Sequence, residues 1–87
     1  MALASLSTID TAGGVIFSSI QSHVRANGIR LIVVGDHVAD HGDGAHSDAT
    51  MAIGSPVVRI NGVRVIRAGD PATCGHIATG SSHVDVV

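Results

Sequence analysis

Four histidines and the only cysteine of the chain lie in two polar loops, predicted at residues 36–48 and 70–76. The first loop contains His37, His41 and His46, and the second contains Cys74 and His76. Three imidazoles and one thiolate make the closed tetrahedral set that a structural zinc ion takes. This soft donor set favours zinc or iron over magnesium or calcium. The spacing therefore predicts a structural metal site, without fixing which three histidines join Cys74.

Other chemistries fit these residues less well. Cys74 and His76 are a candidate nucleophilic pair for a small Cys/His enzyme, and an open zinc site is a second enzymatic alternative. The chain contains no Glu to act as the base of such a site. Its aspartates lack the spacing of a calcium-binding loop and are better interpreted as turn caps. A metal-storage or sensor module is a third class, which predicts readily exchangeable metal.

The composition indicates which elements hold these loops. The chain has 87 residues, with 12 Val, 9 Ile, one Phe and no Lys or Glu, which favours strands over helices. A single Cys rules out an internal disulfide, so a domain this small needs a metal or a partner. The formal net charge of −2, without a basic stripe, argues against nucleic-acid binding. The sequence therefore predicts one small all-β domain spanning residues 1–87.

Two β-hairpins are predicted around the repeated dipeptides Asn27-Gly28 and Asn61-Gly62. Asn-Gly between β-branched runs is typical of a type I′ turn, which needs a positive φ at both positions. Gly35-Asp36 and Gly69-Asp70 then end the strands. A third copy, from Gly80, stops at the end of the chain, whereas residues 1–13 carry little signal. The predicted repeat units cover about 14–36, 48–70 and 77–87.

The stretch from Gly54 to Gly75 resembles the PAAR-repeat proteins, and the similarity extends over about residues 14–87. The residues that carry it are Gly54-Ser55-Pro56, Asn61-Gly62 and Arg67-Ala68-Gly69-Asp70-Pro71-Ala72-Thr73-Cys74-Gly75. The resemblance implies a small cone of hairpins with pseudo-threefold character and a metal-stapled apex. Such proteins cap the trimeric spike of type VI secretion systems or contractile phage tails, without enzymatic activity.

The resemblance also implies a ligand set of three histidines and one cysteine around zinc. Cys74, His41 and His46 match ligand positions of the family. Ala12 stands where the family has its remaining histidine, so His76 is the first substitute expected and His37 the second.

The implied partner is a trimeric VgrG-like or phage baseplate spike, on which one chain sits as a monomer. The tip would pierce the target membrane, contacting it only transiently. The N-terminus lacks a Sec signal, so we expect a protein made in the cytoplasm that leaves with the injection machine or the virion tail.

Overall fold

The chain forms short strands and one 3₁₀ turn, without an α-helix, over residues 2–86, the part that the computed structural model describes. Met1 and Val87, the ends of the predicted domain and of its last repeat unit, lie outside this range. The elements are β1 (Ala2–Leu3), β2 (Thr11–Ala12), β3 (Gly14–Phe17), β4 (Arg25–Ala26), β5 (Ile29–Arg30), β6 (His37–Val38), η1 (Gly44–His46), β7 (Arg59–Ile60), β8 (Val63–Arg64) and β9 (Asp85–Val86). The all-β prediction is confirmed.

Both predicted hairpins form around their Asn-Gly turns. β4 pairs with β5 and β7 pairs with β8, each antiparallel. The φ values are 51° and 80° at Asn27 and Gly28, and 52° and 80° at Asn61 and Gly62. Positive φ at both central residues is the type I′ geometry, which matches the twist of a two-residue hairpin.

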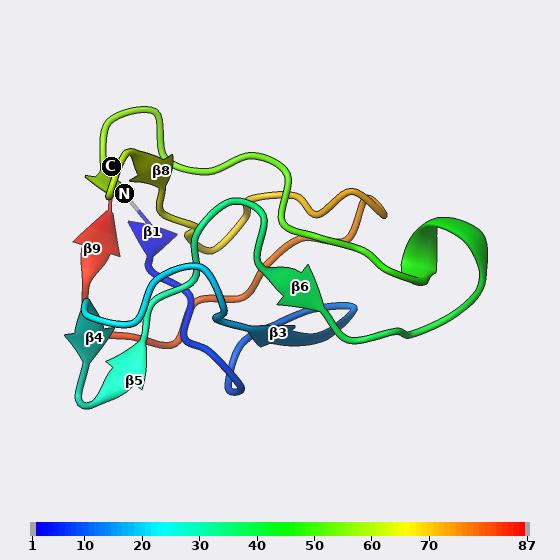
Figure 1. Cartoon of the computed structure of the whole chain (residues 1–87), viewed down its shortest axis with the longest axis horizontal. Coiled ribbons are helices and arrows are strands. Elements are labelled where there is room, and N and C mark those ends of the chain that lie inside the picture. The colour runs from blue at the N-terminus through cyan, green and yellow to red at the C-terminus, as the bar shows by residue number, and fades with distance from the viewer. Residues whose placement is uncertain (1, 87) are drawn as a thin grey trace.

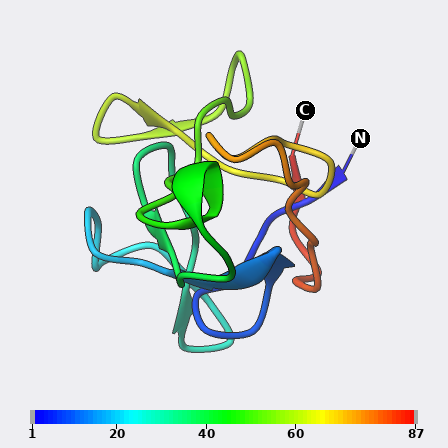
Figure 2. The same cartoon turned by 90° about the vertical axis from the view of Figure 1, so that its right-hand side faces the viewer.

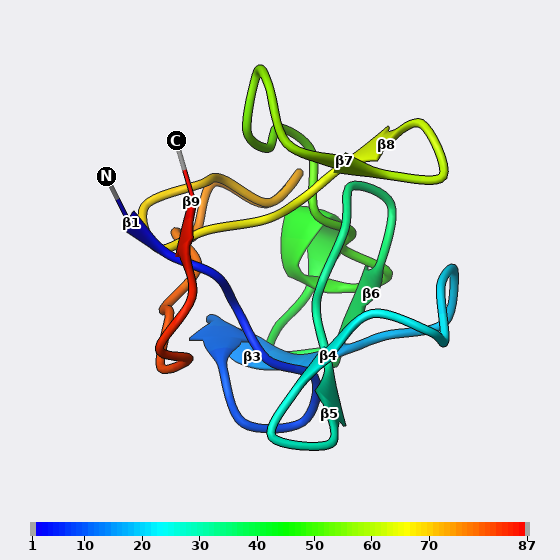
Figure 3. The same cartoon turned by 90° about the vertical axis from the view of Figure 1, so that its left-hand side faces the viewer.

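A third hairpin-like pair joins the two ends of the chain. β1 pairs antiparallel with β9, with Leu3 opposite Asp85. The third repeat is therefore completed by the N-terminal segment, for which the sequence analysis found little signal. Figure 3 shows the three pairs, β1–β9, β4–β5 and β7–β8, around the wide end of the molecule.

A closed ring of backbone hydrogen bonds links the three units. The N–H of Ser5 donates to the carbonyl of Ile66, Ile66 donates to Ile32, and Ile32 donates to Ser5, at 3.0, 2.9 and 3.1 Å. All three residues are completely buried. The ring is flanked by three isolated bridges, Ala4–Arg67, Leu6–Leu31 and Val33–Val65. These contacts give the molecule a pseudo-threefold axis.

The strands after the Asn-Gly turns are shorter than the sequence predicts. Each strand was expected to continue from its Asn-Gly turn toward the Gly-Asp break, but β5 and β8 end at Arg30 and Arg64. Beyond these points the backbone leaves its hairpin and pairs with the neighbouring units, as the bridges of Leu31, Val33 and Val65 show. The run of apolar residues continues past Arg30 and Arg64, but the backbone of these residues bridges to a neighbouring unit of the molecule.

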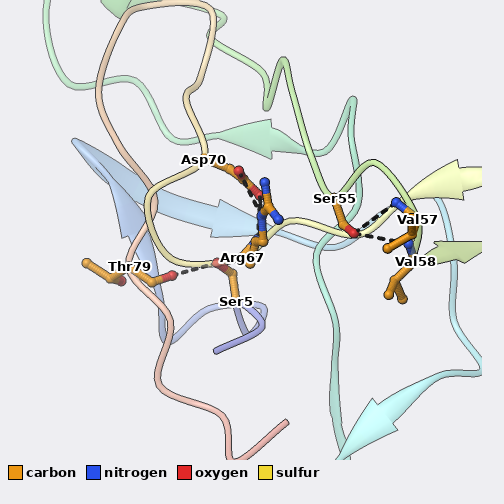
Figure 4. A network of polar contacts seen from close by, with 7 residues as sticks. All are labelled: Ser5, Ser55, Val57, Val58, Arg67, Asp70 and Thr79. Atoms are coloured by element: carbon orange, nitrogen blue, oxygen red, sulfur yellow. Dashed lines mark hydrogen bonds and ion pairs between the residues drawn. The ribbon is translucent and has the colours of Figure 1, made fainter. Parts of the chain in front are cut away.

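A buried aspartate closes the turn that follows the ring in each unit. Asp10, Asp36 and Asp70 accept from backbone N–H groups at 2.7, 2.8 and 2.9 Å, donated by Leu6, Val33 and Arg67 respectively. Gly35 and Gly69, where the strands were predicted to end, take a positive φ just before their aspartates. In the unit completed by the N-terminal segment, Thr8 takes a positive φ two residues before Asp10. Figure 4 shows the Asp70 turn, where Arg67 also forms an ion pair with the carboxylate.

Side-chain hydroxyl and amide groups cap the chain entering each hairpin. Figure 4 shows Ser55, whose Oγ accepts from the N–H groups of Val57 and Val58 at 3.3 and 3.0 Å. Gln21 plays this part in the preceding unit, where its Oε1 accepts from the N–H groups of His23 and Val24.

The molecule is a blunt cone, 32 Å long and 23 by 21 Å across (Figure 1). The hairpins and both termini occupy its wide end, whereas η1 and its loop form the narrow end, which faces the viewer in Figure 2. One apolar cluster lies among the hairpins and includes Val33, Val65 and Val86. A second, around Ile16, Met51 and Ile66, continues toward the narrow end, where it meets Cys74.

Replacing Asp36 with Ala is expected to lower the free energy of unfolding by about 3 kcal/mol. The Asp36 carboxylate is completely buried and accepts from the N–H groups of Val33, Ser19 and Ile20, which would lose this partner. Urea unfolding measures the change. Asp43→Ala removes the same charge from an exposed loop position and should cost less than about 0.5 kcal/mol. Equal losses in the two variants would contradict the role of the buried carboxylate.

Candidate metal centre

Three imidazoles meet at the narrow end of the cone. His41, His46 and His76 each offer a ring nitrogen, and these three atoms all lie within 4.8 Å of one another. The ring centroids are 4.9 to 5.0 Å apart. His41 and His46 are half-buried and His76 is exposed. No carboxylate belongs to this group, so its ligand atoms are ring nitrogens.

The loop after β6 folds back on itself and so brings two of the histidines together. The N–H of His41 donates to the carbonyl of His46 at 3.1 Å. The turn η1 covers Gly44–His46 and closes with the N–H of Ser47 donating to the carbonyl of Gly44. The five-residue separation between His41 and His46 thus becomes a side-by-side arrangement of the two rings.

A tight reversal of the chain presents Cys74 and His76. Pro71 and Ile77 form an isolated bridge, and the N–H of Ala72 donates to the carbonyl of His76 at 2.9 Å. Gly75 lies between the two candidate ligands with φ of +92°, a conformation that favours glycine. Thr73 ties this reversal to the chain beside β6, because its N–H donates to the carbonyl of Thr50.

His41 is oriented by a second hydrogen bond. Its Nδ1 lies 2.9 Å from the carbonyl oxygen of Ala39. Since a carbonyl oxygen only accepts, Nδ1 carries the proton, and Nε2 of the neutral ring presents a lone pair. This is the outer hydrogen bond that metal-binding histidines usually make. Nε2 lies 3.1 Å from Nδ1 of His46 and 3.5 Å from Sγ of the half-buried Cys74.

Two of these distances are close to the edges of a tetrahedral zinc site, and Cys74 lies outside the set of three whose ligand atoms are all within 4.8 Å of one another. Zinc–nitrogen bonds of about 2.0 to 2.1 Å and a zinc–sulfur bond of about 2.3 Å put two nitrogens about 3.3 Å apart, and nitrogen and sulfur about 3.6 Å apart. The His41–His46 and His41–Cys74 distances of 3.1 and 3.5 Å are close to these edges. His41 therefore connects the two loops, because its Nε2 lies beside both His46 and Cys74.

Two glycines leave room for this group. A Cβ atom at Gly13 would lie 2.5 Å from Cδ2 of His76 and 2.6 Å from Nε2 of His41. At Gly14 a Cβ atom would overlap the carbonyl oxygen of Ala39, the same oxygen that orients His41. Ala12, at the position where the PAAR resemblance has a histidine, is completely buried in the second apolar cluster.

The other histidines lie elsewhere. His37, the alternate fourth ligand expected from the sequence, groups with the carboxylates of Asp40 and Asp48, with ligand atoms within 4.8 Å of one another. His23 and His83 precede β4 and β9 at the wide end, and His23 contacts Asn61 through Nε2 at 3.2 Å. Of the two substitutes expected for the missing histidine, the structure brings His76 to His41 and His46.

Two grooves on the described surface have volumes of about 330 and 380 Å³. Both are lined by residues other than the candidate ligands. Over the described residues, no helix is long and apolar enough to cross a membrane.

Comparison with known families gives one match, which covers most of the chain. The family model described as the PAAR motif matches residues 7–79. The matched range includes the ring residues Ile32 and Ile66 and all four candidate ligands. No curated protein matches the chain.

Removing one candidate ligand is expected to remove the metal. Wild-type protein should carry one zinc per chain, and His41→Ala, Cys74→Ser and His76→Ala should each bind zinc at least about tenfold more weakly. His37→Ala serves as the matched control and should keep its zinc. Inductively coupled plasma mass spectrometry of the purified proteins measures the content. Zinc lost from the His37 variant but kept by the His76 variant would contradict the assignment.

A methyl group at Gly13 is expected to weaken zinc binding while leaving the fold intact. Gly13→Ala combines a positive φ of +85° with a clash against His41 and His76. Gly28→Ala is the matched control, because its φ is +80° but nothing lies within 4 Å of the added carbon. Both variants should lose about 1 kcal/mol of stability from backbone strain. Only Gly13→Ala should lower zinc affinity in a competition assay with a chromogenic chelator, and equal affinities would contradict the close packing.

Proposed function

The chain belongs to the PAAR-motif family, and on this premise we propose that it is the zinc-stabilised structural tip of a contractile injection machine. The PAAR motif is associated with spike-tip proteins of type VI secretion systems and phage tails. In this proposal a single chain caps the end of the trimeric β-helical spike, a VgrG-like protein or a phage baseplate spike. Its work is mechanical rather than enzymatic.

The observation that carries the proposal is the hydrogen-bonded ring of Ser5, Ile32 and Ile66. The ring gives one chain a pseudo-threefold axis and three similar outer corners. A homotrimer presents three identical corners around a true threefold axis. A monomer with internal threefold repetition is the simplest shape that contacts all three subunits of such a trimer in the same way.

The wide end offers apolar surface for this contact. Val24, Val58 and Val84 occupy equivalent positions in the three units and are only partly buried against the first apolar cluster. Partly exposed apolar residues around one axis are typical of a surface that a partner covers. The short, two-residue strands at this end also leave edges to which spike strands can add.

The narrow end has a different requirement, which the metal is proposed to meet. Here two loops converge with too few apolar residues to form a core. Zinc, when bound, would join the loops by coordinate bonds to His41, His46, His76 and Cys74, and its binding free energy would become folding free energy. The point would then stay stiff while it pierces a target membrane, which it contacts only transiently.

The proposed route from the cell follows from the proposed partner. The chain would be made in the cytoplasm, assembled onto the spike there and carried out by the secretion machine, or built into a virion tail. In either case the spike, rather than a leader sequence, would direct its export.

One chain is expected to bind each spike trimer. The purified chain is mixed with a trimeric β-helical spike fragment from the same machine. Native mass spectrometry should then give a complex of three spike subunits and one copy of this chain. Val58→Ser should weaken this complex, because Val58 is partly exposed at the wide end. Val57→Ser is the control, since Val57 is 64% exposed outside both apolar clusters. Three chains per trimer, or no complex, would contradict the proposal.

A further inference from the structure

Four of the five arginines face one another in two pairs at the wide end. Arg25 lies directly opposite Arg30 across the β4–β5 hairpin, and Arg59 lies directly opposite Arg64 across β7–β8. Like charges directly opposite in an antiparallel pair destabilise a hairpin. The same unfavourable pairing occurs at equivalent positions of two repeats, so it calls for an explanation beyond hairpin stability.

The described part of the chain supplies no carboxylate to these arginines. Its one ion pair joins Arg67, the fifth arginine, to Asp70. Arg25 donates only to the carbonyl oxygens of Ser22 and Gly28. Arg25, Arg59 and Arg64 are exposed, and Arg30 is half-buried. The guanidinium groups are therefore accessible to an external anion.

The aspartates other than Asp85, which lies on β9 at the wide end, lie away from these pairs. Three aspartates are used in the buried turns, and Asp40, Asp43 and Asp48 lie in the loop of the narrow end. The cone is therefore polarised along its axis, with arginines around the wide end and carboxylates near the point. A partner that approaches the wide end meets a cationic rim although the whole chain has a net charge of −2.

A groove beside the first arginine pair is lined in part by hydroxyl groups. Arg25 and Arg30 line a groove of about 380 Å³ together with Ser7, Thr8 and Ser18. The equivalent groove of the next unit, about 330 Å³, has Arg64 with Val34 and Ile53 in place of the hydroxyls. Guanidinium forks flanked by hydroxyl groups are suited to planar carboxylates.

The third corner departs from this pattern. At the position equivalent to Arg25 and Arg59 it has Asp85, which lies opposite Leu3. Two corners of the cone therefore carry paired positive charges, and the third carries one negative charge. On a spike with three identical corners, at most two can match the charges of the cone.

We propose that these arginines, Arg25, Arg30, Arg59 and Arg64, form a cationic rim that binds carboxylates at the end of the trimeric spike. The inference rests on the proposed function, since it names the chemistry by which the spike is recognised. Charges at the rim of an interface act mainly on the association rate and its salt dependence. The rim would steer the cone onto the spike wide end first, before the apolar surfaces meet.

The test measures association rates of the full chain with the trimeric spike fragment by biolayer interferometry. At an ionic strength of about 0.1 M, Arg59→Asp should slow association by about tenfold. Asp85→Arg makes the third corner resemble the other two, and should accelerate association several-fold. Asp43→Arg makes the same change of charge at the opposite, narrow end of the 32 Å cone, and it should have little effect because charges are screened over a Debye length of about 10 Å.

Four results would contradict the proposal that the cationic rim binds carboxylates of the spike. The first is association that is fast, independent of salt and equal in all variants, which leaves the proposed function standing. The second is an Asp85→Arg variant that associates more slowly than wild type. The third is binding to a DNA duplex with the same dependence on Arg59, which would assign the arginines to phosphates. The fourth is an absence of any spike binding by the wild-type chain, which overturns the proposed function together with the rim.

Discussion

Backbone hydrogen bonds that run from unit to unit around one axis hold this small protein together. The N–H groups of Ser5, Ile32 and Ile66 are completely buried, and each finds its acceptor only in a neighbouring unit. A buried backbone group left without a partner costs about 1 to 3 kcal/mol, so no unit is expected to keep this structure alone. The ring also explains why the N-terminal segment must return to the C-terminal one. Without the N-terminal segment the ring would lack Ser5, and β9 would lack its partner strand β1.

The taper of the cone sets the second constraint. Apolar clusters fill the wide end and the middle of the cone. The narrow end past these clusters is formed by the polar loop that contains η1. Burial of apolar surface cannot fix these loops, so directional bonds must do so. The bond from His41 to Ala39 and the clearance at Gly13 and Gly14 would prepare the narrow end for the proposed metal. The two ends are thus proposed to be stabilised by different physics, and the arginine pairs and the loop aspartates lie at opposite ends.

Local chemistry made much of this architecture predictable. Asn27-Gly28 and Asn61-Gly62 specified type I′ turns, and Gly35 and Gly69 specified the breaks, because positive φ has a clear residue preference. The N-terminal part of the third unit escaped prediction, since it lacks an Asn-Gly turn and has Thr8 where the other units have glycine. The preference for His76 over His37 as the fourth ligand stays a prediction, although the structure groups His76 with His41 and His46. Spacing alone allows both residues, and only the long-range packing of the second loop against the first brings His76 to His41.

The central claim is that three imidazoles and one thiolate clamp the narrow end. X-ray absorption at the zinc edge of the purified, intact chain tests it directly, because the method counts and identifies the atoms bound to the metal. The account predicts three nitrogens at about 2.0 Å and one sulfur at about 2.3 Å. A shell of nitrogen and oxygen atoms without sulfur would contradict it, because Cys74 would then lie outside the site. Protein purified without chelators that contains no metal would contradict it as well.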